Sequence, residues 1–402
     1  RGKAFINILG IPIRVSKKYY SSVYGPTLKN KTGFFSVRTG SLFKVRALEQ
    51  WWKMNKAKSF DEFYSILEMN EIPGYNIGYA DKDDNIFYIS NGLIPIRNDK
   101  FKWTGVLPGN TSETLWTDYY KTHELPQVIN PESGYIYNAN HSPFKSTSID
   151  ENPNPKDFAS NMGYETFDNN RSTRIFELVE SYKSIDYEDF KKIKYDNKFP
   201  TPFNYNFMDV NKIMEMKSDD YPEIADLIKQ IQNWDRSTDA ASTGAGAYAM
   251  FYYTLADKYF YKSYYDRNFS KSLIADCLVE VKKQMKKYFN STIIKLGDFQ
   301  KLIRGGKEIP IFGMPDVITA MNASKYKDGK VQVTHGESYI QLVKFSSKGT
   351  EIESIISYGS SDNEESPHYD DQMEKYSKFQ TKKMSFDRDW VLNNSKRIYN
   401  PR

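Results

Sequence analysis

The chain has 402 residues, of which 39% are hydrophobic and 27% charged, and its formal net charge is +5. This composition is typical of a globular protein with one large or two ordinary domains and excludes a disordered chain. The sequence has no run of about 18 apolar residues, which predicts no membrane-spanning helix. It also has no basic stripe interleaved with aromatic residues, which argues against nucleic-acid binding.

The first 160 residues predict strands, two helices and a long loop region. In chain order, the predicted elements are a strand–turn–strand unit over 4–14, a strand over 33–38, helices over 48–54 and 60–69, and a hairpin over 76–90. Ser59 is the predicted N-cap of the second helix, and Glu62 three residues later predicts a capping box. Residues 91–160 are rich in Gly, Pro, Asn and Thr, and long ordered loops of this kind are often functional.

The remainder of the chain predicts helices followed by strands. The expected elements are helices over 174–182, 221–234, 246–265 and 270–288, and strands over 330–333 and 339–343. Strands, then helices, then strands again predict an α+β fold. We expect three regions: a sheet and loop part over 1–170, a mainly helical region over 171–310, and C-terminal strands with a polar tail over 311–402.

Common catalytic signatures are missing from the sequence. It contains no Gly-x-Ser-x-Gly, His-Glu-x-x-His, Walker loop or Cys-x-x-Cys motif. We interpret the single cysteine, Cys277, as a buried structural thiol on an amphipathic helix. No two histidines have metal-ligand spacing, so we expect all of them to be structural residues in loops or turns. The histidines are His123, His141, His335 and His368.

The densest polar group is the segment 138–143, with the sequence Asn-Ala-Asn-His-Ser-Pro. Pro143 fixes its own φ and restricts Ser142, so side-chain amides in this turn can be held in one orientation. Preorganised N–H groups of this kind can form an oxyanion hole, which stabilises developing negative charge. The alternative from local sequence is that these residues simply form Asx-turns.

Several longer segments carry a family resemblance. In chain order they are NIGYADKDDNIFY at 76–88, WTGVLP at 103–108, NPESGYIYNANHSP at 130–143, YGSS at 358–361 and SPHYDDQ at 366–372. Together, and in this order, they resemble the penicillin acylase family of N-terminal-nucleophile hydrolases. The resemblance implies part of a four-layer αββα sandwich with a helical insertion.

The resemblance also implies a reaction. Such enzymes are amide hydrolases, or acylases, which remove an acyl group from an amide such as an acyl-homoserine lactone, a lipopeptide or a penicillin. A Ser that begins the β subunit attacks the amide carbonyl, and its own α-amine takes the proton, so nucleophile and base share one residue.

The resemblance assigns roles to four positions. Asn140 matches the Asn whose side-chain amide donates to the oxyanion, and Arg171 matches an Arg that orients the site near the nucleophile. Trp51 and Tyr75 match aromatic or pocket positions that bind the acyl group. His141 departs from the family pattern, which has a second Asn at this position.

The resemblance implies that no cofactor is required, although relatives can bind a structural calcium ion. Asp150 and Glu151 are the candidate calcium ligands by position. No Gly-Ser-Asn junction occurs in the chain, so we expect the C-terminal part of a β subunit that lacks the nucleophile and is inactive alone. Its expected partners are the α subunit and the N-terminal part of the β subunit from the same precursor, and its expected location is periplasmic or secreted.

Two alternatives remain at this stage. One is a catalytically inactive relative that acts as a binding or scaffold protein. The other is a sugar-binding module, suggested by abundant Tyr and Trp in loops. The acylase interpretation predicts a buried Trp51, whereas a sugar-binding module predicts exposed aromatic rings.

Overall fold

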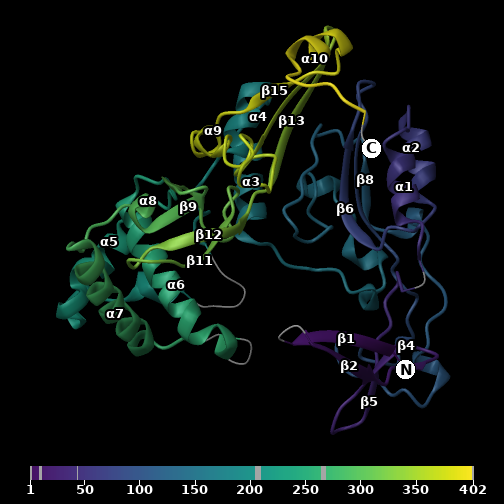
Figure 1. The fold of residues 1–402 in the computed structure, drawn as a ribbon, viewed down its shortest axis with the longest axis horizontal. Helices are drawn as coiled ribbons and strands as arrows, with labels where there is room; N and C mark the ends of the chain where they lie inside the picture. The colour runs from purple at the N-terminus through teal and green to yellow at the C-terminus, as the bar shows by residue number, and fades with distance from the viewer. Residues whose placement is uncertain (1, 9–10, 43, 204–209, 264–268, 401–402) are drawn as a thin grey trace. The chain divides into compact units, whose positions relative to one another are not determined.

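The protein is described by a computed structural model that covers residues 2–8, 11–42, 44–203, 210–263 and 269–400. The chain divides into two compact units, Arg1–Phe167 and Asp168–Arg402. Both units mix helices and strands, so the fold is α+β as predicted (Figure 1). The helices and the C-terminal strands expected over 171–310 and 311–402 lie in the same compact unit.

The first unit contains short antiparallel sheets and a helical pair. Its elements are the strands β1 (Gly2–Ile8), β2 (Ile11–Lys17), β3 (Tyr20–Ser22), β4 (Gly25–Lys29), β5 (Phe34–Ser36), β6 (Gly74–Ala80), β7 (Ile86–Gly92) and β8 (Gln127–Ile129), and the helices α1 (Ala47–Met54) and α2 (Phe60–Leu67). The strands form the hairpin β1–β2 and the sheets β3–β4–β5 and β6–β7–β8. The hairpins predicted over 4–14 and 76–90 are therefore confirmed.

Helix α2 packs on one face of the sheet β6–β7–β8, because its apolar residues repeat every three to four positions. Phe63 and Leu67 are buried against Phe87 and Ile89 of β7, and α1 lies beside α2 (Figure 1). The opposite face of the sheet carries Tyr88, since neighbouring residues of a strand point to opposite faces.

The start of α2 confirms one half of the predicted capping box. The Ser59 hydroxyl accepts a hydrogen bond from the Glu62 amide at 3.2 Å. The Glu62 carboxylate, however, accepts from the amide of Lys58 at 2.8 Å and not from that of Ser59. The reciprocal contact is thus shifted by one residue towards the N-terminus.

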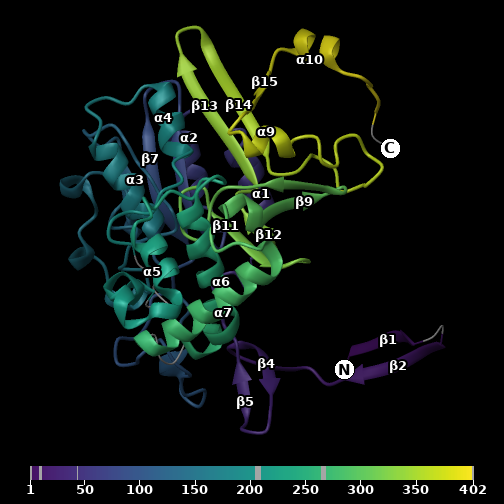
Figure 2. The ribbon, with the colours of Figure 1, turned by 90° about the vertical axis from the view of Figure 1, so that its left-hand side faces the viewer.

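The second unit contains the remaining helices and strands. The helices are α3 (Asn170–Glu180), α4 (Tyr187–Lys194), α5 (Ala225–Gln232), α6 (Thr243–Ser263), α7 (Lys271–Phe289), α8 (Leu296–Phe299), α9 (Met373–Ser377) and α10 (Arg388–Asn394). The strands are β9 (Gln300–Arg304), β10 (Lys307–Pro310), β11 (Met321–Lys325), β12 (Val331–Gly336), β13 (Tyr339–Ser346), β14 (Gly349–Ile356) and β15 (Lys382–Met384). They form the sheets β10–β9–β12–β11 and β13–β14–β15. Figure 2 shows β13 and β14 as a long hairpin with α9 beside its base.

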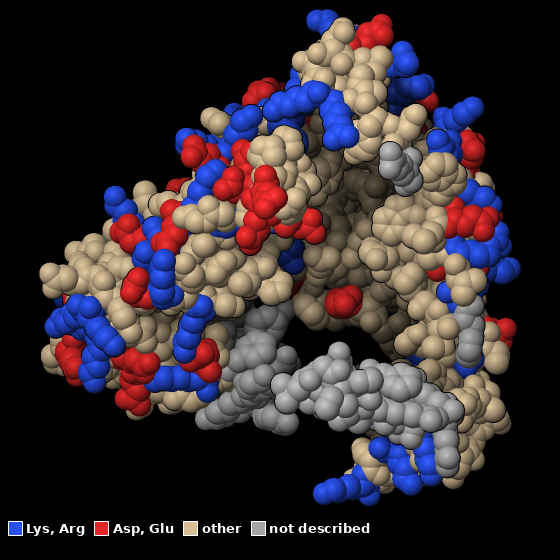
Figure 3. Space-filling model, in the orientation of Figure 1, with Lys and Arg blue, Asp and Glu red and all other residues tan. Residues whose placement is uncertain are grey.

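The helices α5, α6 and α7 enclose the largest apolar core. Ser270 caps the N-terminus of α7. The buried residues of this helix recur at helical spacing and are Ile274, Cys277, Leu278, Val281 and Met285. Cys277 is 1% exposed, and burial raises the pKa of its thiol to about 11, which confirms a buried thiol. On the face shown in Figure 3, charged side chains of both signs are interspersed over this unit.

Several sequence predictions are corrected in this unit. The helix expected from 221 begins only at Ala225, because short 3₁₀ turns precede it. His335 lies within β12 and pairs with Asn322, so the expectation of a loop or turn is wrong for this histidine. The strands β9 and β10 occupy residues 300–310, at the end of the region over 171–310 that was expected to be mainly helical, although no helix was predicted at these residues. The end of the helix predicted to residue 265 lies outside the described residues.

Within the described part of the chain, no helix combines the length and apolarity needed to cross a membrane.

Candidate active site

The loop 138–143 presents a single exposed amide among buried neighbours. Asn140 is exposed and has a left-handed backbone, with φ of 56°. Ala139, His141 and Ser142 on either side of it are buried, with 6%, 2% and 2% of their surface exposed. Asn is one of the few residues other than Gly that adopts a left-handed backbone at low cost. The loop therefore holds the Asn140 side chain at the surface on a fixed backbone.

Hydrogen bonds connect this loop to the sheet beneath it. The Tyr88 hydroxyl donates to Asn76 Oδ1 at 2.7 Å and accepts from Asn138 Nδ2 at 3.4 Å. Asn138 Oδ1 in turn accepts from the Asn140 amide at 2.9 Å. Burial raises the pKa of Tyr88 to about 12, which keeps the phenol protonated and able to donate. This series of hydrogen bonds therefore links the loop that carries Asn140 to strands β6 and β7 and fixes its position relative to them.

The buried ring of His141 stabilises the same loop through hydrogen bonds to its backbone. Its Nδ1 accepts from the Ala139 amide at 3.1 Å, and its Nε2 lies 2.7 Å from the Lys145 carbonyl oxygen. Because a backbone N–H can only donate and a carbonyl can only accept, this pattern assigns the neutral tautomer with hydrogen on Nε2. The ring also stacks on Tyr137, with centroids 5.0 Å apart and planes 22° apart. The expectation of a structural histidine is confirmed at this position.

Arg171 lies in the first turn of α3, in the second unit. Asn169 caps this helix by accepting from the Ser172 amide at 2.9 Å. Arg171 Nε donates to Asp316 Oδ1 at 3.2 Å, while the amide and the side chain of Asn170 both donate to Oδ2 at 3.0 Å. Burial is the main cause that raises the pKa of Asp316, although these donors oppose it. Asp316 thus fixes the guanidinium of Arg171 from a loop far away in sequence.

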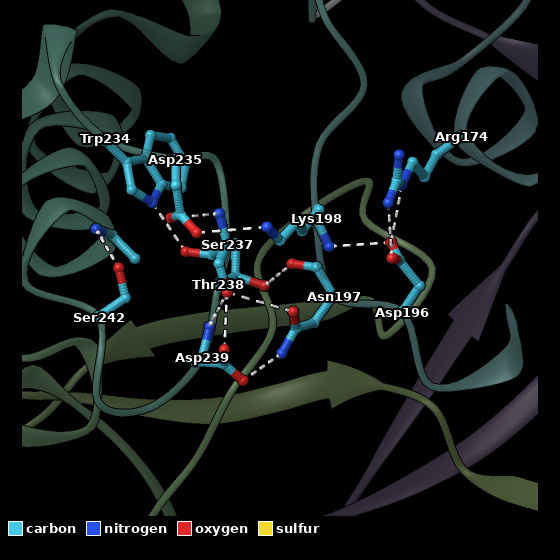
Figure 4. Close-up of polar contacts among 11 residues, drawn as sticks. Arg174, Asp196, Asn197, Lys198, Trp234, Asp235, Ser237, Thr238, Asp239 and Ser242 are labelled. Atoms are coloured by element: carbon cyan, nitrogen blue, oxygen red, sulfur yellow. Dashed lines mark hydrogen bonds and ion pairs between the residues drawn. The ribbon is translucent and has the colours of Figure 1, made fainter. Parts of the chain in front are cut away.

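A second arginine anchors α3. Figure 4 shows Arg174 directed at Asp196, where Nε donates to Oδ1 at 3.0 Å and Nη2 to Oδ2 at 2.8 Å. Such two-point pairs are among the strongest hydrogen bonds of side chains. The neighbouring Asn197 donates to Asp239 at 2.6 Å, which connects the segment after α4 to the start of α6. The helix that carries Arg171 is therefore held at its N-cap, by Asp316 and by Asp196.

The two predicted acyl-binding aromatics meet in the first unit. Trp51 of α1 and Tyr75 of β6 make an edge-to-face contact, with centroids 5.6 Å apart. Trp51 is 47% and Tyr75 53% exposed, so the expectation of a buried Trp51 is wrong for this chain. Gln50 is the only buried residue of the eight in α1, so little of this helix, Trp51 included, packs against the unit. This exposure agrees with the sugar-binding alternative on this one point.

The two calcium candidates differ in their surroundings. Glu151 accepts from the amides of Glu132 and Ser133 and from the Ser148 hydroxyl, the last at 2.6 Å. These hydrogen bonds, led by those of the serines, lower the pKa of its carboxyl group. Glu151 is thus occupied as a backbone acceptor and fits a cation poorly, and the calcium prediction rests on the exposed Asp150. The described residues contain no group of three or more His, Cys, Asp or Glu side chains that could hold a metal ion.

The structure places Asn140, Trp51 and Tyr75 in the first unit and Arg171 in the second. Sequence reasoning did not find Tyr88 or Asp316. Tyr88 was part of the quoted hairpin motif, so a signal was present, but its role depends on which face of the sheet it occupies. Asp316 gave no local signal.

A family model and several known proteins match this chain, and the longest of these matches extend over most of its length. The family model described as Penicillin amidase matches residues 3–392. The acyl-homoserine lactone acylase PvdQ of Pseudomonas syringae pv. syringae is 24% identical over 92% of this chain and 53% of the relative. The penicillin G acylase of Escherichia coli is 30% identical over 31% of this chain and 15% of that relative. The chain therefore spans about half the length of the PvdQ relatives that it matches.

A solved structure gives the same picture of the fold. The thermostable penicillin G acylase from Alcaligenes faecalis aligns with a TM-score of 0.65 and 14% sequence identity, and the alignment covers 100% of this chain and 82% of that chain. At this identity the likeness shows the fold alone.

Proposed function

This chain belongs to the penicillin amidase family, and on that premise we propose that it forms the C-terminal part of the β subunit of an acylase. The reaction is hydrolysis of an amide between an acyl group and an amine. The candidate substrates are acyl-homoserine lactones, lipopeptides and penicillins. Acyl-homoserine lactones come first for assay, because the match to PvdQ extends over 92% of the chain.

The observation that carries this proposal is the exposed Asn140 on its rigid left-handed turn. In the proposed mechanism, a Ser at the N-terminus of a segment outside these residues attacks the carbonyl carbon, and its own α-amine takes the hydroxyl proton. The carbonyl oxygen becomes an anion and accepts a hydrogen bond from the Asn140 side-chain amide. The protonated α-amine gives this proton to the leaving nitrogen as the tetrahedral intermediate collapses to an acyl-enzyme and a free amine. Water then attacks the acyl-enzyme, which releases the carboxylate and restores the Ser hydroxyl. Arg171, held by Asp316, orients the groups around the nucleophile.

The proposed partners follow from the share of the relatives' length that this chain covers. The chain spans 53% of PvdQ and contains no Gly-Ser-Asn junction, which supports partners from the same precursor: an α subunit and the N-terminal part of the β subunit. We place the enzyme in the periplasm or outside the cell. The alternative is a relative that retains the fold but lacks the nucleophile and acts as a binding or scaffold protein.

The first test is the mass of the products of the full reading frame. Two chains, with a β chain that begins with Ser, support the acylase, and hydrolysis is then measured on acyl-homoserine lactones and penicillin G. A single uncut chain without hydrolysis supports the inactive relative.

The second test addresses Asn140 itself. Asn140→Gly removes the side-chain amide and keeps the left-handed backbone, which Gly adopts without strain. We expect kcat to fall by about 10²–10³, the usual effect of losing one oxyanion donor. Asn290→Gly is the matched control, because Asn290 is also an exposed Asn with a left-handed backbone, φ 51°, at the end of α7. Equal rates for the two variants would refute the role of Asn140.

A further inference from the structure

A cavity of about 880 Å³ lies within the first unit, and the proposed function does not use it. The sheet β3–β4–β5 and the loop 103–109 line it, so the motif WTGVLP at 103–108 forms part of its wall. Its lining includes the rings of Phe34, Trp103 and Trp116 and the side chains of Arg38 and Arg97. Asn140, Trp51 and Tyr75 are not among the lining residues.

Each of the two arginines lies over a tryptophan. The guanidinium carbon of Arg38 is 4.4 Å from the ring centroid of Trp116, and that of Arg97 is 5.7 Å from that of Trp103. Stacking on an aromatic face leaves the N–H edge of a guanidinium available to bind a carboxylate. The cavity thus combines apolar faces with two cationic edges.

Neither arginine has an acidic partner in the described part of the chain. Arg38 donates to the carbonyl oxygens of Trp116 and Val23, both at 3.2 Å. Arg97 donates through Nη1 to the carbonyl oxygens of Asn161 at 2.6 Å and Met162 at 3.3 Å. Among the residues that the structure describes, the lining of the cavity contains no Asp or Glu. The positive charge is therefore balanced only by dipoles.

Arg97 shows most clearly that a partner is missing. Its Nε is buried and has no hydrogen-bond partner among the described residues. Burial also lowers the pKa of this arginine, because no carboxylate offsets the loss of solvation. A buried donor without a partner is costly. An anion in the cavity would not reach the buried Nε itself, but it would offset the desolvated charge of the guanidinium group.

A second cavity of similar size provides a contrast. It is also about 880 Å³ and lies between α6, α7, β11 and β12. Two of the four lysines that line it are paired, Lys325 with Asp257 at 2.8 Å and Lys330 with Glu308 at 3.0 Å, and the lining also includes Glu280 and Asp328. That cavity therefore has acidic side chains among its lining, whereas the lining of the cavity with Arg38 and Arg97 has none among the described residues.

We propose that the cavity lined by Arg38, Arg97, Trp103 and Trp116 binds a carboxylate carried on an apolar, ring-sized body. The guanidinium groups bind the carboxylate oxygens, as arginine forks commonly do. The indole and phenyl faces contact the apolar body. The volume lies within the range of roughly 300–1,000 Å³ that is usual for small-molecule sites.

The test is calorimetric titration of the protein expressed from the full reading frame. The probe is 3-phenylpropionate, and 3-phenylpropan-1-ol is its neutral counterpart. We expect the acid to bind at least tenfold more tightly than the alcohol. We also expect Arg38→Gln to weaken binding of the acid at least tenfold. Arg46→Gln should not change it, because Arg46 pairs with Glu49 on the surface and does not line the cavity.

A second variant guards against misfolding of Arg38→Gln. Val106 lines the cavity and is 81% exposed, so Val106→Glu leaves the packing intact and brings a competing carboxylate to the arginines. It should weaken binding of the acid at least tenfold at an unchanged melting temperature. Equal binding of acid and alcohol, or unchanged binding in both variants, would overturn the proposal. Hydrolysis is assayed on the same samples, so a protein that binds the acid but cleaves no amide contradicts only the proposed function.

Discussion

Replacing Tyr88 by Phe tests whether the sheet β6–β7–β8 holds the loop of Asn140 in place. The change removes one hydroxyl from a side chain that is 1% exposed. Asn76 loses its 2.7 Å donor, and Asn138 loses a weaker acceptor at 3.4 Å. A buried polar group without its partner costs about 1–3 kcal/mol, and the low end applies because Asn76 is exposed and water can replace the donor.

The expected loss of stability is therefore about 1 kcal/mol. The expected loss of kcat is about tenfold, which corresponds to ~1.4 kcal/mol. This loss is smaller than that for Asn140→Gly, because the donor itself remains and only its support is weakened. KM should stay nearly constant, since Tyr88 acts through Asn138 and not on the substrate.

The assay is steady-state hydrolysis of an acyl-homoserine lactone by the processed enzyme, with a thermal melt of the same sample. Tyr79→Phe is the matched control, because Tyr79 lies on the adjacent strand and its hydroxyl donates to Asp81 at the hairpin turn, at 2.8 Å. If both variants have the same kcat, the connection from the sheet to Asn140 does not position the oxyanion donor.

Three further predictions concern the second unit. Arg174→Lys keeps the charge and loses the two-point contact with Asp196, so we expect α3 to loosen and stability to fall by about 1–3 kcal/mol, measured by urea unfolding. Gly313→Ala should lower stability by at least about 2 kcal/mol, because φ is +85° and a β-carbon would overlap the Thr319 carbonyl oxygen; an unchanged urea midpoint would contradict this. Cys277 should resist iodoacetamide at pH 8 in the folded protein and react in urea, because burial raises its thiol pKa to about 11. Mass spectrometry measures the modification, and a modified thiol under native conditions would show that α7 opens.

The elements that the sequence predicted carry their signal within a few residues. The hairpin β6–β7 has alternating residues around an Asp-rich turn, and α7 has a capping serine and one apolar face. Helix α4 was missed because it is mostly charged, and only Ile193 of its eight residues is buried. Strands β9 and β10 were missed although they pair with each other around Gly305 and Gly306, which is a local hairpin signal. Only the parallel partner of β9, β12, which follows about 30 residues later, is not revealed by the sequence of β9.

The residues of the candidate site also differ in whether the local sequence could predict them. Asn140 could be predicted because the motif around it is contiguous in sequence. Asp316 could not, because it reaches Arg171 across 145 residues and only the folded chain brings the two together. Trp51 was predicted by position alone, and position does not determine how much of a ring is exposed.

The raised pKa of Tyr88, which supports the loop of Asn140, predicts the pH at which this loop begins to lose stability. Tyr88 ionises only near pH 12, whereas its ordinary pKa is 10. Since the folded pKa is raised, the stability that Tyr88 contributes is complete below pH 10 and is lost as the pH rises through 12. The loop should therefore keep its geometry at neutral pH. A pH optimum in that range would then arise from the α-amine of the proposed nucleophile, and Tyr88→Phe should lower kcat without moving the optimum. A shifted optimum would show that Tyr88 is coupled to the titrating group itself.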